Sequence, residues 1–243
     1  MIQASTNPAD SNYAIGIILY DGFDSLDVAG PQQVFYILGN LTGIKVHLIG
    51  PDKDKLVTSY EGLHWKVTED YASAKDLVLN TIFVPGGNQQ NFNEVLLNAN
   101  DPFYDFLKRK AETAELITAV CVGSLLLAHA GLLDGYECTT HWAYKNLLSL
   151  FPEVMIAPGF PRYVIDRNRI TGGGISSGID EAFAIAEILK GPEVAKQVQL
   201  IMQYAPNPPI QSGDPSLAGP QTLQKVASAI DSTALYDQLK AVL

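Results

Sequence analysis

Cys121 is the residue of this 243-residue chain whose position best suits chemistry. It stands between the β-branched run 116–120 (LITAV) and the helix-forming run 123–133 (GSLLLAHAGLL). This order predicts a sharp strand-to-helix turn at the carboxyl edge of a parallel sheet, where ligands bind. Amide groups that open a helix lower the pKa of a nearby thiol, so we expect a reactive nucleophile. The alternative is a buried structural cysteine, and the pattern alone leaves both open.

Cys138, the second cysteine, lies inside the short predicted strand 136–140, and we interpret it as structural. The four histidines are scattered, without HxH, HExxH or CxxC spacing. A metal site built from neighbouring residues is therefore not expected.

Pro85, Gly86 and Gly87 end the predicted buried strand 81–87. Backbone N–H groups at the end of a parallel strand could stabilise developing negative charge, with the N–H of Val122 as a second donor. An ordinary Pro-Gly-Gly turn is the alternative.

The surrounding segments alternate between strand and helix patterns. Predicted strands cover 13–22, 44–50, 81–87, 116–120 and 136–140, and 163–174 reads as two strands joined by a turn. Predicted helices cover 101–114, 123–133, about 142–151 and 177–191, and Gly191 and Pro192 are the stop signals of the last one. Residues 25–40 read as a loop that leads into a helix, with Pro31 in the first turn of that helix. The alternation predicts an α/β fold, a parallel sheet with helices on both faces.

The chain divides into three parts. Residues 1–12 have no basic start and no apolar run, so we expect no signal peptide and a disordered or loosely held N-terminus. Residues 13–203 read as one α/β domain. Residues 204–220 hold five prolines and form a predicted ordered arm, followed by a helical segment at 221–243. We expect 204–243 to pack on the domain or across the partner of a homodimer.

Composition excludes several classes of partner. The formal net charge is −10 and no Lys/Arg cluster occurs, which argues against nucleic acid and anionic membranes. No apolar run reaches the roughly 18 residues that a membrane span needs. With only two cysteines, we expect a cytoplasmic protein with reduced thiols.

Several motifs in combination resemble the ThiJ/PfpI superfamily, and within it the isonitrile hydratases. These motifs are AVCVGSLLLAHAGLLDG (119–135), TTHWAY (139–144), TGGGISSGIDEAFAIAE (171–187), LDVAGPQQVF (26–35), VPGG (84–87) and VQLIMQYAPNPPIQSGDP (198–215). The resemblance runs from about residue 13 to 220. It implies a flavodoxin-like, class I glutamine amidotransferase-like sandwich of one domain.

The resemblance also implies roles for two residues. Cys121 matches the nucleophile, and Asp27 matches an aspartate that hydrogen-bonds it, where much of the superfamily has Glu. The implied activity is that of a carbon–nitrogen lyase, which hydrates an isonitrile to an N-substituted formamide through a thioimidate, with no metal, nucleotide or redox cofactor. Asp27 could instead be a helix N-cap, and Asp24 is a competing acid that reads as a solvated loop residue.

Other site residues follow from the same resemblance. Gly86, Gly87 and Val122 match the pocket loops, and His141 matches a histidine found near the cysteine in much of the superfamily. The alternative for His141 is a partly buried structural residue. We expect Gly172–Gly174 to permit close packing near the thiol, with Ser176 or Ser177 capping the next helix.

Val122 departs from the family pattern. PfpI-type proteases have His there, so proteolysis is not expected, and hydratases more often have Thr. Valine keeps the branched shape and loses a hydrogen bond. Two alternatives stay open: another cofactor-free activity, glyoxalase-like or hydrolytic, and a non-catalytic ligand-sensing or redox-sensing domain.

Overall fold

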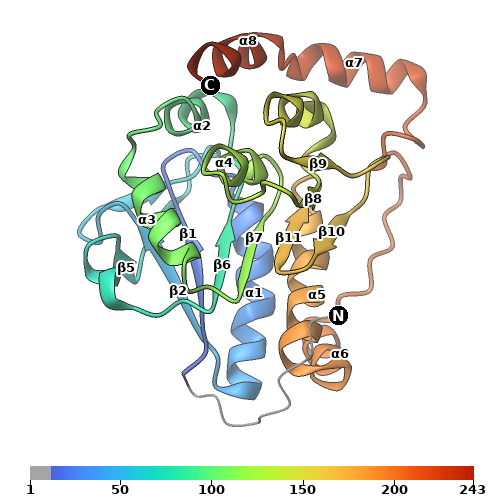
Figure 1. Ribbon diagram of the computed structural model, residues 1–243. Helices are drawn as coiled ribbons and strands as arrows, with labels where there is room; N and C mark the ends of the chain where they lie inside the picture. Colours follow the sequence, from blue (N-terminus) through green and yellow to red (C-terminus); the bar gives the residue numbers. More distant parts are fainter. Residues whose placement is uncertain (1–11) are drawn as a thin grey trace.

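A seven-stranded sheet forms the centre of the molecule, in the order β10-β11-β7-β6-β1-β2-β5 (Figure 1). The computed structural model describes residues 12–243, so the expectation for the first residues falls outside the described part of the chain. Neighbouring strands pair in parallel except β10 (Tyr163–Asp166), which pairs antiparallel with β11 (Arg169–Gly172). The predicted α/β architecture is confirmed.

Three central strands are buried along their whole length. They are β1 (Ala14–Ile18), β6 (Thr81–Val84) and β7 (Leu116–Ala119), with β2 (Lys45–Gly50) beside β1. Because helices cover both faces, these strands read as continuous apolar runs rather than as alternating patterns. The remaining strands are short: β3 (Leu56–Thr58), β4 (His64–Lys66), β5 (Glu69–Asp70), β8 (Glu137–Cys138) and β9 (Met155–Ile156).

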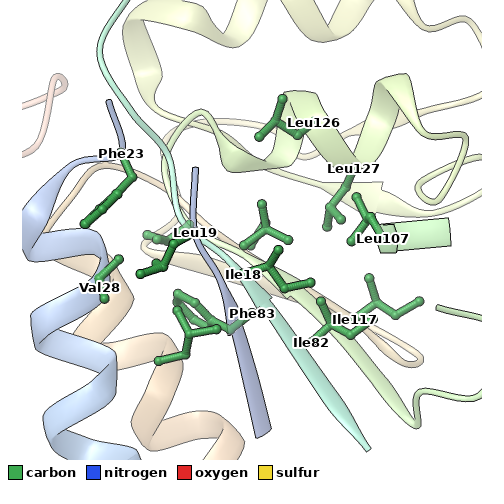
Figure 2. Packing of buried hydrophobic residues seen from close by; sticks show 14 of the residues in the cluster. Ile18, Leu19, Phe23, Val28, Ile82, Phe83, Leu107, Ile117, Leu126 and Leu127 are labelled. Atoms are coloured by element: carbon green, nitrogen blue, oxygen red, sulfur yellow. The ribbon is translucent and has the colours of Figure 1, made fainter. Parts of the chain in front are cut away.

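Helices form a layer on each face of the sheet. One face is covered by α1 (Ser25–Thr42), α5 (Ser177–Lys190) and α6 (Pro192–Met202) (Figure 1). The other face is covered by α2 (Gln89–Leu96), α3 (Pro102–Ala111), α4 (Gly123–His129) and the 3₁₀ helix η2 (Trp142–Leu150). A short 3₁₀ turn, η1 (Ser73–Asp76), precedes β6. Figure 2 shows Val28 of α1 on one side of the strands and Leu107 and Leu127 on the other.

Helix α1 begins earlier than the sequence indicates. The side chain of Asp24 accepts a hydrogen bond from the Leu26 N–H at 3.0 Å and caps the helix at Ser25. The predicted loop before the helix is therefore wrong, and Pro31 lies inside α1 rather than in its first turn. This early start places Asp27 on the first turn of the helix.

Other boundaries also differ from the prediction. Pro192 ends α5 as expected and at the same time begins α6, because proline fits the first turn of a helix. The helix predicted around 142–151 is of the 3₁₀ type, and α2 was not predicted. The final segment forms two helices, α7 (Pro220–Ile230) and α8 (Thr233–Val242), instead of one.

Helix α8 folds back onto the domain. Leu235 and Leu239 are buried, and the Ser232 hydroxyl donates to the Ala143 carbonyl of η2 at 3.1 Å. In Figure 1, α8 lies above α2, and the irregular segment 204–219 runs along the side of the molecule from α6 to α7. Within residues 12–243, no helix has the length and apolar composition that a membrane crossing requires.

Candidate functional site

Cys121 lies in the turn between β7 and α4, as the sequence predicts. Its φ is 57°, in the left-handed region that favours glycine. Val122 follows with φ −74° and ψ −4°, and the Gly123 N–H donates to the Val120 carbonyl at 3.0 Å. These values resemble a type II′ turn with Cys121 in its first central position. A non-glycine residue held there stores about 1–3 kcal/mol of strain, which is typical of functional sites.

Gly123 allows this turn to press against the neighbouring strand. A Cβ atom at position 123 would lie 2.5 Å from the Val84 carbonyl oxygen and 2.7 Å from the Pro85 carbonyl oxygen. Backbone atoms cannot move away from such a contact, so only glycine fits. The turn that carries Cys121 is thereby fixed against the end of β6.

Asp27 is fully buried beside this turn. Its Oδ2 atom accepts a hydrogen bond from the Gly86 N–H at 2.8 Å, and its Oδ1 atom is buried without a hydrogen-bond partner. The interpretation of Asp27 as the helix N-cap is wrong, because Asp24 occupies that position. The interpretation of Asp24 as a solvated loop residue is also wrong, since it caps α1 and is only partly exposed.

Two loops are joined to form the wall around Asp27. The Asp24 N–H donates to the Gly86 carbonyl at 2.9 Å, and the Asn88 N–H donates to the Gly22 carbonyl at 3.1 Å. Phe23 and Gly87 form the isolated antiparallel bridge between these bonds. Backbone hydrogen bonds therefore hold the β1–α1 and β6–α2 loops together.

Gly86 is the point at which the site residues converge. A Cβ atom at position 86 would lie 2.8 Å from each of three atoms, Asp27 Oδ2, Cys121 Cβ and the Val122 nitrogen. Asp27 Oδ2 and Cys121 Cβ are therefore separated by no more than twice that distance. The missing side chain at Gly86 leaves the space in which the carboxyl and the thiol approach each other.

Burial sets the protonation of both groups. It raises the pKa of Asp27 well above its usual value, and the charge of Asp24 raises it further. Hydrogen bonding by the Gly86 N–H and the neighbouring thiol lowers the pKa of Asp27, but by less. Burial also raises the pKa of Cys121 well above its usual value, and the charge of Asp27 adds to this. Both shifts favour the protonated forms, because two adjacent buried negative charges are unfavourable.

The predicted lowering of the Cys121 pKa at the start of α4 is wrong. A hydrogen bond from the Val122 N–H to the sulfur does lower this pKa, but burial and Asp27 outweigh it. The sequence could not show this, because both opposing causes come from segments far from residue 121.

His141 lies at the start of η2, in the wall of the adjoining pocket. Its Nδ1 atom accepts a hydrogen bond from the Ala143 N–H at 3.2 Å, and burial lowers its pKa to about 4. The ring is therefore neutral at neutral pH. Its Cδ2 atom would lie 3.3 Å from a Cβ atom at Gly174, so this glycine lets the ring approach.

A pocket of about 1050 Å³ lies next to the segments that carry the thiol and the carboxyl, although neither Cys121 nor Asp27 is among its lining residues. Leu26, next to Asp27, contributes to its wall, as does Thr140, whose hydroxyl donates to the Cys121 carbonyl. Its apolar lining includes Leu26, Trp142, Phe160, Ile175, Ile179, Ile210 and Leu217. Cys121 itself is 6% exposed, so only a slim group could reach the sulfur.

The first residue of the arm is tied to α5. The Tyr204 hydroxyl donates to Asp180 Oδ1 at 2.7 Å, and Arg162 forms an ion pair with Asp180 Oδ2 at 2.6 Å. The Arg162 guanidinium also donates to the Ser176 hydroxyl at 3.0 Å. Ser176 occupies the N-cap position of α5 as predicted, but its side chain makes no capping hydrogen bond.

Glu181 is a buried acid that the sequence did not single out. Both of its carboxyl oxygens lack hydrogen-bond partners, and burial, with a contribution from Asp27, raises its pKa well above the usual value. Glu181 Oε2 would lie 2.5 Å from a Cβ atom at Gly172, which confirms close packing at this glycine. Within the amphipathic pattern of α5, nothing distinguishes Glu181 from a surface residue.

Both cysteines are free thiols, and Cys138 is buried in β8 as predicted. Across the part of the chain that the structure describes, no group of three or more His, Cys, Asp or Glu side chains is arranged to hold a metal ion.

Comparison with known sequences identifies the family. Residues 14–188 match the model of the DJ-1/PfpI family. The chain belongs to the DJ-1/PfpI family. The resemblance to the ThiJ/PfpI superfamily is thus confirmed, and two of its motifs, 119–135 and 26–35, contain Cys121 and Asp27.

Relatives within the DJ-1/PfpI family include an enzyme and regulators. Isonitrile hydratase of Pseudomonas putida is 41% identical over 204 residues, which cover 84% of each chain. The HTH-type transcriptional regulator GbdR of Pseudomonas aeruginosa is 27% identical over 195 residues, which cover 79% of this chain and 50% of the regulator.

Solved structures confirm the flavodoxin-like fold. A ThiJ/PfpI family protein from Pseudomonas syringae superposes with a TM-score of 0.84 and is 29% identical, covering 95% of this chain and 90% of its own. Drosophila melanogaster DJ-1beta superposes with a TM-score of 0.70 at 21% identity, covering 80% of this chain and all of its own, which shows the fold alone.

Proposed function

We propose that this protein hydrates isonitriles to N-substituted formamides, with Cys121 as the nucleophile and Asp27 as its acid–base partner. The observation that carries the proposal is the convergence of the thiol, the carboxyl and the Val122 N–H around Gly86. The 41% identity to an isonitrile hydratase over most of both chains supports the same reaction class.

The terminal carbon of an isonitrile, R–NC, accepts a sulfur nucleophile when a proton is delivered to it. In the first step the S–C bond forms, and the thiol proton passes through the Asp27 carboxyl to the same carbon. The product is the thioimidate R–N=CH–S–Cys121. The raised pKa of both groups keeps a proton available for this transfer at neutral pH.

Water completes the reaction. It adds to the thioimidate carbon, one proton moves to nitrogen, and the C–S bond breaks to release R–NH–CHO and the thiol. The net reaction consumes one water per isonitrile, and no electron is gained or lost. Asp27 accepts and returns the protons, and the Val122 N–H stabilises the sulfur as it leaves.

The pocket favours an apolar R group. The isonitrile group is linear and slim, so it can reach a thiol that is 6% exposed, while the wider part of the molecule stays in the pocket. Trp142, Phe160 and Ile179 contribute apolar surface there, and burial of apolar area stabilises binding by about 25 cal/mol per Å².

The test uses the two cysteines as a matched pair. Purified protein, Cys121→Ala and Cys138→Ala are incubated with one aliphatic and one aromatic isonitrile, and formamide is measured by mass spectrometry. We expect formamide from the unaltered chain and from Cys138→Ala, and none above background from Cys121→Ala. Equal formamide production by Cys121→Ala would reject the proposal.

A ligand-sensing role is the second candidate, since the chain matches the part of GbdR that makes up half of that regulator. A sensor would bind an isonitrile or another small electrophile without releasing product. Quenching of Trp142 fluorescence by ligand in a Trp65→Phe variant, without formamide, would favour this role. If the isonitriles are inert, a screen of other small electrophiles would test for glyoxalase-like or hydrolytic activity.

We further propose a cytoplasmic homodimer. Leu200 and Ile201 of α6 are 81% and 59% exposed, and Ile210 of the arm is 72% exposed, so a second copy would remove apolar area from water. Sedimentation equilibrium tests this: the mass of a dimer is expected, and a monomer at micromolar concentration would contradict it.

A further inference from the structure

The carbonyl oxygen of Cys121 accepts two hydrogen bonds from side chains that have no part in the proposed chemistry. The Thr140 hydroxyl donates to it at 2.9 Å, and the Ser124 hydroxyl donates at 3.1 Å. Both side chains are buried, so neither bond is shared with bulk water. A strained residue therefore has its carbonyl held from two directions.

The two hydroxyls come from separate parts of the fold. Ser124 belongs to α4, directly after the turn, whereas Thr140 follows β8. The Thr139 N–H donates to the Thr171 hydroxyl of β11 at 2.9 Å, which fixes the backbone next to Thr140. Thr140 thus connects the turn at Cys121 to strand β11 of the main sheet.

Holding this carbonyl also orients an N–H group. The Cys121 carbonyl and the Val122 N–H belong to one planar peptide unit, so fixing the direction of the oxygen fixes that of the hydrogen on the opposite side. That N–H lies beside the Cys121 side chain, since a Cβ atom at Gly86 would lie 2.8 Å from both the Val122 nitrogen and Cys121 Cβ, and it lowers the pKa of the thiol. A rotation of this peptide would turn the N–H away from the sulfur without moving the thiol itself.

We infer that Thr140 and Ser124 are positioning residues, which hold the Cys121–Val122 peptide so that the Val122 N–H stabilises negative charge on the sulfur. Their part in turnover rests on the proposed function, but their effect on the thiol does not. The side chain of Val122 has no hydroxyl with which to orient the thiol. In this chain, Thr140 and Ser124 instead orient the Val122 N–H by holding the Cys121 carbonyl.

The competing explanation is that the two hydroxyls only satisfy a buried carbonyl. Thr118 provides the matched control, because its buried hydroxyl donates to the Ile82 carbonyl at 2.8 Å within the sheet. Thr118→Val and Thr140→Val each remove one buried hydroxyl-to-carbonyl bond, but only the second acts on Cys121. Thr140→Ser retains the hydroxyl and serves as the rescue.

The experiment measures thiol reactivity in a Cys138→Ala background, where Cys121 is the only cysteine. Alkylation by iodoacetamide is followed by intact mass across a range of pH. We expect Thr140→Val to react about five- to tenfold more slowly at a given pH, with its profile displaced to higher pH, since one hydrogen bond contributes about 1 kcal/mol. Thr140→Ser and Thr118→Val should match the parent, and adding Ser124→Ala to Thr140→Val should slow the reaction further.

Turnover provides the second measurement. With an isonitrile that is converted, Thr140→Val is expected to lower kcat by a similar factor and leave KM unchanged, because the pocket surface is retained. If no variant makes formamide, the proposed function fails while alkylation still tests the positioning role. Equal alkylation profiles for Thr140→Val and Thr118→Val would overturn the inference.

Discussion

Asp27 Oδ2 accepts a hydrogen bond from the Gly86 N–H at 2.8 Å, across 59 residues of sequence. This amide therefore holds the acid in place, and it is not open to a substrate as we expected from the Pro-Gly-Gly sequence. Among the predicted donors, the Val122 N–H is the one that meets the sulfur. The glycines at 86 and 123 permit this arrangement because no side chain fits at either position.

Asp27→Asn tests the acid. The amide oxygen can still accept from the Gly86 N–H, but the side chain can no longer carry a proton between sulfur and carbon. We expect kcat for formamide production to fall by about 10²–10⁴-fold, the range for loss of a general acid–base group.

The matched control is Asp24→Asn. Asparagine also caps helices well, so α1 should still begin at Ser25, and turnover should fall far less than in Asp27→Asn, since only the contribution of the Asp24 charge to the raised pKa of Asp27 is lost. Turnover by Asp27→Asn equal to that of Asp24→Asn would remove Asp27 from the mechanism.

Val122→Thr tests the departure from the hydratase pattern. Val122 is buried directly after the nucleophile, and threonine has nearly its shape with an added hydroxyl. If a positioned hydroxyl contributes about 1–3 kcal/mol in the transition state, kcat/KM should rise by about 5- to 160-fold. Val120→Thr, the same change just before Cys121, should give no gain. An unchanged rate in Val122→Thr would show that the hydroxyl is dispensable in this chain.

Glu181→Gln tests the protonation of the buried acid. The pKa of Glu181 is raised in the folded state, so the folded protein binds more protons and its stability falls as pH rises above the unfolded pKa, about 4.5. Glutamine has no such dependence. Between pH 5 and pH 8, the free energy of unfolding of the unaltered chain should therefore fall relative to that of Glu181→Gln, by at most about 1.4 kcal/mol per pH unit.

Urea unfolding at several pH values measures this difference. Glu187→Gln, on the exposed side of the same helix, is the control for loss of a carboxylate. Parallel stability curves for Glu181→Gln and the unaltered chain would mean that Glu181 is ionised in the folded protein.

Leu239→Ala tests the docking of the last helix. Leu239 is buried where α8 meets the domain, so its truncation should lower the free energy of unfolding by about 2–5 kcal/mol. Leu243→Ala, at an exposed position, should have little effect. A small loss for Leu239→Ala would show that α8 adds little to the stability of the domain.

The elbow at Cys121 could be predicted from sequence because its causes are local. An apolar run, a cysteine, a glycine and a run of helix formers define a strand, a turn and a helix within a few residues. The central strands were also predictable, since burial on both faces leaves continuous apolar runs.

The electrostatics of the site could not be predicted. The raised pKa of Cys121 depends on Asp27, which lies in α1, and on burial by loops from β1 and β6. Glu181 reads as part of an ordinary amphipathic helix, and its burial follows from packing against β11. The hairpin of β10 and β11 was predicted, because a short turn joins its strands, whereas the 3₁₀ form of η2 was not.

The most direct test of the mechanism is to trap the covalent intermediate. The protein is mixed with an isonitrile, quenched in acid during turnover, and digested for peptide mass spectrometry. The mechanism predicts that the peptide containing Cys121 gains the full mass of the isonitrile, while the peptide containing Cys138 is unchanged. Formamide production with Cys121 unmodified at every quench time, and undiminished in Cys121→Ala, would contradict it.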